Sequence, residues 1–119
     1  MGLLEVQMEI ANPQDPGLRT SVELLVDTGA TFSMIPRRIL EQIGISPLER
    51  AECEVADGRR IGRDIGEAIF FWKGRRGTSK VIFGEDGDAA VLGVVALESL
   101  VLEVDPHNRQ LRPAKLVLY

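Results

Sequence analysis

The chain has 119 residues, of which 45% are hydrophobic and 27% charged, as expected for one globular domain over residues 1–119. Its 18 acidic and 14 basic residues give a formal charge of -4, and the bases form no block interleaved with aromatics, so nucleic acid is not an expected partner. No apolar run approaches the roughly 20 residues that span a bilayer, so no membrane contact is expected either. One Cys and one His are too few for a thiolate metal site, and we expect no metal or cofactor. Cys53 has no disulfide partner, which predicts a cytoplasmic location.

The N-terminal segment has the pattern of a β-hairpin. Residues 4–10 (LEVQMEI) alternate apolar and polar side chains, as in a strand with one buried face. NPQDPG, residues 12–17, supplies turn-forming residues. The second strand ends with VELLV, residues 22–26, where almost every position is apolar. We therefore expect this strand to be buried on both faces, with Asp27 at the end of a core strand.

A short amphipathic helix is predicted after this hairpin. Ser33 and Pro36 can open it, and its apolar side includes Leu40 and Ile43. Gly44 follows the last apolar position and predicts its end.

The middle of the chain reads as two further hairpins. Residues 51–72 contain the turn dipeptide Asp57–Gly58 between two extended segments. A turn at residues 73–77 then leads into a returning strand at residues 78–84. β-Structure therefore dominates this region.

The last third begins with a loop and ends with a hairpin. AVLG, residues 90–93, is a candidate buried strand, and VVALESL, residues 94–100, can form about two helical turns. Residues 101–105 and 110–118 are predicted to pair around the turn PHN. The whole pattern predicts an all-β domain with one or two short helices.

The sequence Asp27–Thr28–Gly29 is the first candidate for chemistry. A strand that delivers a carboxylate, followed at once by a hydroxyl and a glycine, forms a tight turn in which backbone N–H groups reach the acid. The triplet alone is better explained as a strand end that caps the next segment. In a core setting, however, a carboxylate is costly unless it is satisfied, and a second acid sharing its proton would satisfy it. The chain holds one DTG, so that second acid would be Asp27 of another copy.

LLVDTGATFSMIP resembles the active-site segment of the retropepsin-like aspartic proteases, a group of single-domain homodimers that includes retroviral proteases and bacterial and archaeal relatives. Three landmarks of that family occur in order: the apolar strand with DTGA, a flap hairpin around VADGRRI, and VLG leading into the helix VVALESL. Residues 94–111 look most like the bacterial members. The resemblance implies an acid protease barrel, closed by homodimerisation, that acts as an aspartic endopeptidase on polypeptides.

The resemblance also implies roles for single residues. Asp27 of each subunit would join a dyad in which one carboxylate activates water as general base and the other donates a proton. Thr28 would brace the paired loops across the dimer. Gly29 would let the backbone pass close to the substrate, and Ala30 would line the cleft.

Two other segments have implied roles. The flap would close over the peptide with a tip formed by Ala56, Asp57, Gly58 and Arg59, a more charged tip than the glycine-rich one of retroviral members. Leu92 and Gly93 would form a loop that supports the catalytic turn from behind, with Gly93 allowing close backbone packing. Val94 stands where retroviral members usually place a polar residue.

Two alternatives to a protease remain open at this level. The atypical flap and Val94 also suit a peptide-binding module that keeps the fold and cleft with weak or no hydrolysis. The chain could instead be a structural dimerisation domain in which Asp27 is a satisfied turn residue.

Three further residues are weaker functional candidates. His107 lies in a turn and is expected to face solvent, and Trp72 and its aromatic neighbours are expected in the core or an interface. Cys53 has no His partner nearby in sequence, and a free Cys commonly packs as a small apolar residue, although basic neighbours leave a reactive thiol open.

Overall fold

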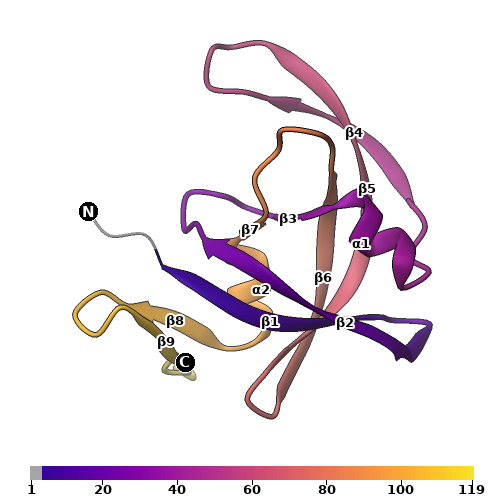
Figure 1. Cartoon of the computed structure of the whole chain (residues 1–119). Helices are drawn as coiled ribbons and strands as arrows, with labels where there is room; N and C mark the ends of the chain where they lie inside the picture. The colour runs from indigo at the N-terminus through magenta and orange to yellow at the C-terminus, as the bar shows by residue number, and fades with distance from the viewer. Residues whose placement is uncertain (1–3) are drawn as a thin grey trace.

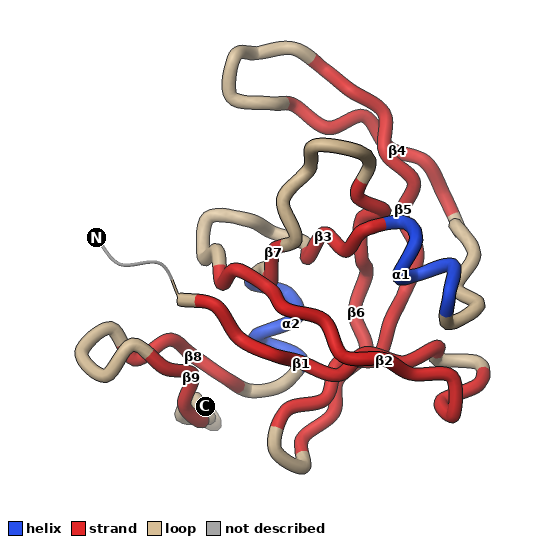
Figure 2. The backbone as a smooth tube through the Cα atoms, viewed as in Figure 1, coloured by secondary structure: helices blue, strands red, loops and turns tan. Residues whose placement is uncertain are grey.

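The computed structural model describes residues 4–119, which form nine strands and two short helices (Figures 1 and 2). This confirms the predicted, mainly β class. No helix within residues 4–119 is long and apolar enough to cross a membrane. In chain order the elements are β1 (Glu5–Asn12), β2 (Asp15–Val26), β3 (Ser33–Pro36), α1 (Arg37–Gln42), β4 (Glu49–Glu54), β5 (Arg60–Trp72), β6 (Arg75–Gly84), β7 (Val91–Leu92), α2 (Val94–Ser99), β8 (Leu102–Asp105) and β9 (Gln110–Pro113).

One large sheet closes on itself to form a barrel. Its strand order is β1-β2-β7-β3-β6-β5-β4, and an additional pairing of β1 with β5 joins its two sides. In that pairing Ile10 lies opposite Phe70, and both side chains are fully buried. A closed sheet has a single interior, so alternate residues of each strand point into the core. The predicted barrel is therefore present, but its sheet closes within one chain by the β1–β5 pairing, and the role of homodimerisation stays a prediction.

The first hairpin forms as predicted but with a tighter turn. Strand β2 already begins at Asp15, which lies opposite Asn12. The Oδ1 atom of Asn12 accepts a hydrogen bond from the backbone N–H of Gln14 at 2.8 Å. A side chain that bonds the backbone two residues later compacts a turn. The predicted loop over residues 12–17 is therefore wrong for residues 15–17, which belong to β2.

The end of β2 is buried on one face only. Val22 and Leu24 are buried, whereas Glu23 is exposed and Leu25 is only partly covered. The prediction that residues 22–26 are buried on both faces is wrong, because a strand of a closed barrel has only one face toward the interior. The outer face stays open in the single chain.

The predicted helix starts later than Ser33. Ser33 is the first residue of β3, which pairs in parallel with β6, and its side chain is fully buried. Helix α1 begins directly after Pro36, and its buried side includes Leu40. It ends at Gln42, and Gly44 stops it as predicted: this glycine has a φ of 78° and donates its N–H to the carbonyl of Glu41 at 3.0 Å.

The central hairpins share the long strand β5. Residues 60–65 of β5 pair with β4, and its residues from Ile65 onward pair with β6. The outer part of the β4–β5 hairpin projects away from the closed barrel in Figure 1. One strand thus belongs to the barrel at one end and to a protruding hairpin at the other.

Helix α2 and the β8–β9 hairpin add the last part of the core. Leu97 and Leu111 join the main apolar cluster. The predicted final strand is too long, because β9 ends at Pro113. Pro113 lies opposite Leu102, the first residue of β8, so no residue of β8 remains to pair with the chain beyond it. Residues 115–119 are exposed and lie outside any strand.

Candidate active site

The DTGA loop, residues 27–30, which we call the catalytic loop after its expected role, follows directly from β2. The N–H of Asp27 donates to the carbonyl of Leu92 at 2.9 Å, next to the parallel pairing of β2 with β7. The carboxylate Oδ1 of Asp27 accepts from the N–H of Gly29 at 2.9 Å. The N–H of Ala30 donates to the Asp27 carbonyl at 3.1 Å. These bonds fix the backbone around the acid and orient its carboxylate.

The catalytic loop is open to solvent in the single chain. Asp27, Thr28 and Gly29 are exposed, and Ala30 is partly buried. The expectation of a core position for Asp27 is therefore wrong for one chain, because the strand leaves the barrel interior at this point. An exposed carboxylate carries no desolvation penalty. Burial of this acid requires a second surface.

The start of helix α2 is bonded to the catalytic loop. The N–H of Val94 donates to the carbonyl of Ala30 at 2.8 Å, and that of Val95 donates to the carbonyl of Thr31 at 3.0 Å. The first N–H groups of a helix have no partner within the helix. Here they hold the far end of the loop, while Leu92 holds its beginning. The segment around Leu92 and Gly93, which we call the supporting segment, is thus hydrogen-bonded to both ends of the catalytic loop.

Gly93 packs against the same loop without room for a side chain. A Cβ atom at this position would lie 2.7 Å from the carbonyl carbon of Phe32 and 2.9 Å from the carbonyl oxygen of Ala30. The N–H of Gly93 donates to the Oγ of buried Ser33 at 2.9 Å. Sequence reasoning missed Ser33 as a site residue, and a hydroxyl at a core-facing strand position was the available signal.

Replacement of Ser33 by Ala should destabilise the protein by about 1–3 kcal/mol, because the buried N–H of Gly93 would lose its acceptor. Urea unfolding followed by fluorescence would measure the change. The matched control is Ser21→Ala, at an exposed position of β2, for which little change is expected. Equal stabilities for the two variants would contradict a supporting role for Ser33.

The predicted flap tip forms the turn between β4 and β5. The N–H of Gly58 donates to the carbonyl of Val55 at 2.9 Å, and Gly58 has a φ of 88° that favours glycine. The Nε of Arg59 lies 2.6 Å from the Oδ2 of Asp57. Ala56 and its tip neighbours are exposed. The charges of the tip are therefore paired with each other at its surface.

The remaining candidates have structural positions. His107 is exposed in the β8–β9 turn, as predicted, and its backbone N–H donates to the side chain of Asp105. Phe70 is fully buried and Trp72 packs against the core cluster. Cys53 is a free, half-buried residue of β4. In the part of the chain that the structure describes, no group of His, Cys, Asp and Glu is arranged to hold a metal ion.

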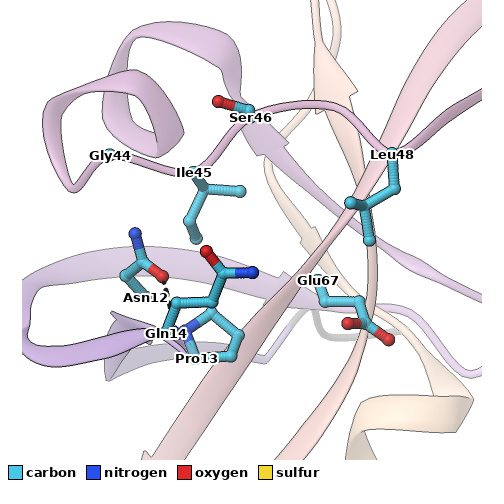
Figure 3. A pocket seen from close by; sticks show the side chains of 8 residues that line it. All are labelled: Asn12, Pro13, Gln14, Gly44, Ile45, Ser46, Leu48 and Glu67. Carbon is cyan, nitrogen blue, oxygen red and sulfur yellow. Dashed lines mark hydrogen bonds between the residues drawn. The ribbon is translucent and has the colours of Figure 1, made fainter.

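A pocket of about 160 Å³ lies between the β1–β2 turn, the segment after α1 and the side chain of Glu67 on β5 (Figure 3). Its polar wall includes Asn12, whose Nδ2 donates to the carbonyl of Ile43 at 3.0 Å. The full lining is Asn12, Pro13, Gln14, Gly44, Ile45, Ser46, Leu48 and Glu67. None of these residues belongs to the catalytic loop, the flap tip or the supporting segment, so the pocket is separate from the candidate active site.

Comparison with known families identifies the segment that contains the catalytic loop. A model of the aspartyl protease family, Asp_protease_2, matches residues 6–66, just over half of the chain. The match runs from β1 through the catalytic loop and the flap tip into β5. A search of curated proteins finds no match.

Solved structures share the fold at low sequence identity. The simian foamy virus protease matches with a TM-score of 0.55 and 21% identity over 82% of this chain and 92% of that one. The protease-reverse transcriptase of prototype foamy virus matches with a TM-score of 0.51 and 19% identity, over 98% of this chain but 12% of the viral chain. The chain therefore belongs to the aspartyl protease family and has the retropepsin-like fold.

Proposed function

We propose that the chain is an aspartic endopeptidase whose active site forms between two copies. The observation that carries the proposal is the exposed Asp27 carboxylate, oriented by the N–H of Gly29 in a loop fixed at both ends. The family and the fold support a protease. One such acid per chain is half of the pair that this chemistry uses.

The proposed mechanism uses the two Asp27 carboxylates in different protonation states. Two acids in contact do not both ionise readily, so the pair shares one proton. The ionised carboxylate takes a proton from water as the water attacks the peptide carbonyl, and the protonated one donates to the developing tetrahedral species. Collapse of that species breaks the C–N bond once the amine is protonated. No acyl-enzyme is formed.

An exposed apolar terminus supports the proposed homodimer. Leu116, Leu118 and Tyr119 are 75%, 96% and 114% exposed in the single chain, and Val117 between them is also exposed. A continuous apolar segment in solvent is unfavourable and commonly marks an interaction surface. We infer that the second copy covers this segment and, at the same time, brings the second Asp27 to the first.

The proposed substrate is an extended polypeptide held between the flap tip and the catalytic loop. Thr28 would brace the two loops, and Gly29 and Ala30 would lie along the peptide. The tip turn around Gly58 would close over the peptide backbone. The free, half-buried Cys53 suits the reducing cytoplasm as the place of action.

The test compares cleavage of a denatured protein mixture by the wild type and by Asp27→Asn from acidic to neutral pH. We expect the substitution to lower the rate at least about 100-fold, because the amide can neither take nor share the proton. The matched control is Asp15→Asn, an exposed acid at the start of β2, which should cleave like the wild type. Equal cleavage by wild type and Asp27→Asn would remove Asp27 from the mechanism.

The same assay separates the second candidate, a peptide-binding module with weak hydrolysis. The paired charges of Arg59 and Asp57 favour this candidate, because they leave a less adaptable tip for contact with substrate. A pepstatin-like inhibitor that binds the wild type without any turnover of a broad peptide library would support it. Rapid turnover of any peptide would exclude it.

A further inference from the structure

Charged side chains connect the base of the flap hairpin to the barrel at two points. We define the flap hairpin as residues 49–64 and the flap clamp as two sets of ion pairs beside its base. The first set joins Arg63 to Asp88. The second joins Arg37 to Asp64 and Glu85.

The Arg63–Asp88 pair is bidentate and mostly shielded from solvent. The Nε of Arg63 donates to Oδ2 of Asp88 at 2.8 Å and its Nη2 donates to Oδ1 at 3.0 Å. The two side chains are only 16% and 19% exposed. The guanidinium holds the pKa of the Asp88 carboxyl below its ordinary value. Paired geometry of this kind is both stronger and more specific in direction than a single surface contact.

Asp88 also orders the loop in which it lies. Its Oδ2 accepts from the backbone N–H of Glu85 at 2.8 Å, and its own N–H donates to the carbonyl of Glu85 at 3.0 Å. The same carboxylate thus fixes the turn after β6 and binds the flap strand β5. A shift of this loop would therefore move the carboxylate that binds Arg63.

The second set of contacts joins α1 to the loop after β6 and to the base of the flap hairpin. Arg37, the first residue of α1, donates from Nε and Nη2 to the carboxylate of Glu85, with the shortest contact at 2.8 Å. Its Nη2 also donates to Asp64 on β5, to which Arg50 of β4 donates from the other side. These contacts lower the pKa values of Asp64 and Glu85. Both strands of the flap hairpin are therefore bonded into the clamp.

The loop that contains Asp88 leads directly into β7, the strand that is bonded to the catalytic loop. Two residues after Asp88, the carbonyl of Ala90 accepts from the N–H of Leu25 at 3.0 Å. Leu92 then accepts from the N–H of Asp27 at 2.9 Å. A short stretch of chain and two backbone hydrogen bonds thus connect the ion pair at the flap base with the strand that holds the acid.

We propose that Arg63 and Asp88 are positioning residues that set how the flap stands over the catalytic loop, and so how tightly substrate is held. The inference rests on the proposed peptidase function. Residues 60–64 pair with β4 and lie beyond the β5–β6 ladder, so strand pairing with the barrel does not fix their orientation. The clamp does so instead. Neither residue takes part in the proton transfers.

The first test measures the flap itself and does not need activity. In an Asp27→Asn background, Asp88→Asn keeps the shape of the side chain but removes its charge from Arg63. We expect backbone amides of residues 50–62 to exchange hydrogen about tenfold faster, with no change in β1 and β2. The matched control is Glu103→Gln, which breaks an exposed pair with Arg112 on the β8–β9 hairpin.

A double-mutant cycle separates a joint role from two unrelated ones. Arg63→Gln, Asp88→Asn and the double variant are compared by the same exchange measurement. If the two side chains act as one clamp, the double variant should exchange about as fast as either single variant. The proposal is overturned if the two substitutions multiply each other's effect on the exchange rate. It is also overturned if the exchange rate in Asp88→Asn equals that of its parent.

The second test uses a peptide that the wild type cleaves, with Asp27 intact. We expect Asp88→Asn to raise KM about tenfold while kcat changes less than about threefold, because a looser flap weakens holding rather than chemistry. A fall in kcat of about tenfold, with KM unchanged, would overturn the positioning role. If the wild type cleaves nothing, the proposed function fails, and the exchange experiment alone still decides whether the clamp holds the flap.

Discussion

Mixing equal amounts of wild-type and Asp27→Asn protein should leave about one quarter of the wild-type activity per total protein, because only the dimers with two intact acids would work. If each chain acted alone, about one half would remain, since dilution alone would lower the rate. The measurement is the initial rate of peptide cleavage at fixed total protein, after time for the subunits to exchange. The two outcomes distinguish a shared site from an independent one.

A mixture of wild type with Asp15→Asn controls for nonspecific effects of mixing two variants. Asp15 is exposed at the start of β2, and we expect its mixture to keep the full rate. Retention of about half the activity after wild type and Asp27→Asn are unfolded and refolded together, which forces the subunits to mix, would refute the shared dyad even if the single variant is inactive. Asp27 would then act within one chain.

Replacement of Gly93 by Ala should cost about 3 kcal/mol of stability and most of the activity, because the added Cβ would overlap backbone atoms that no rotamer change can move. Phe32 and Ala30 supply those atoms, at 2.7 and 2.9 Å from the new carbon. Relief would require movement of the catalytic loop away from β7. Thermal or urea unfolding measures the first effect and peptide cleavage the second.

The matched control for this substitution is Gly17→Ala. Gly17 lies in β2 without a positive φ, and the nearest neighbour of its added Cβ would be a side-chain oxygen of Asp15 at 3.6 Å. We expect a change within about 0.5 kcal/mol and normal activity. If Gly93→Ala is as stable and active as Gly17→Ala, close packing behind the catalytic loop is not required.

Much of the fold follows from local pattern. Alternation in residues 4–10 predicted β1, and the apolar pair before Gly93 predicted the short buried strand β7. The single DTG and its order relative to VLG pointed to the family that the comparison confirms. The two strand signals succeed because each depends on residues adjacent in sequence.

The errors arise where tertiary structure decides. Residues 22–26 look buried on both faces by composition, yet barrel closure leaves one face outside. Ser33 carries a helix-opening signal, yet pairing with β6 places it in a strand. The flap clamp was not predicted at all, because Arg63 and Asp88 are 25 residues apart and a sequence does not show which charges meet.

The outer part of β5 pairs only with β4, which separates the β4–β5 hairpin from the strand ladders of the barrel. Ile65, which pairs with both β4 and β6, marks the boundary, and next to it Gly66 packs closely, because an added Cβ there would lie 3.0 Å from the ring of Phe83 and 3.2 Å from the Ser46 carbonyl oxygen. On the outer side of this point, insertions or a different tip change neither the strand register of the barrel nor its apolar interior. For the peptidase that we propose, selection can therefore alter what the flap recognises while the framework around Asp27 stays the same.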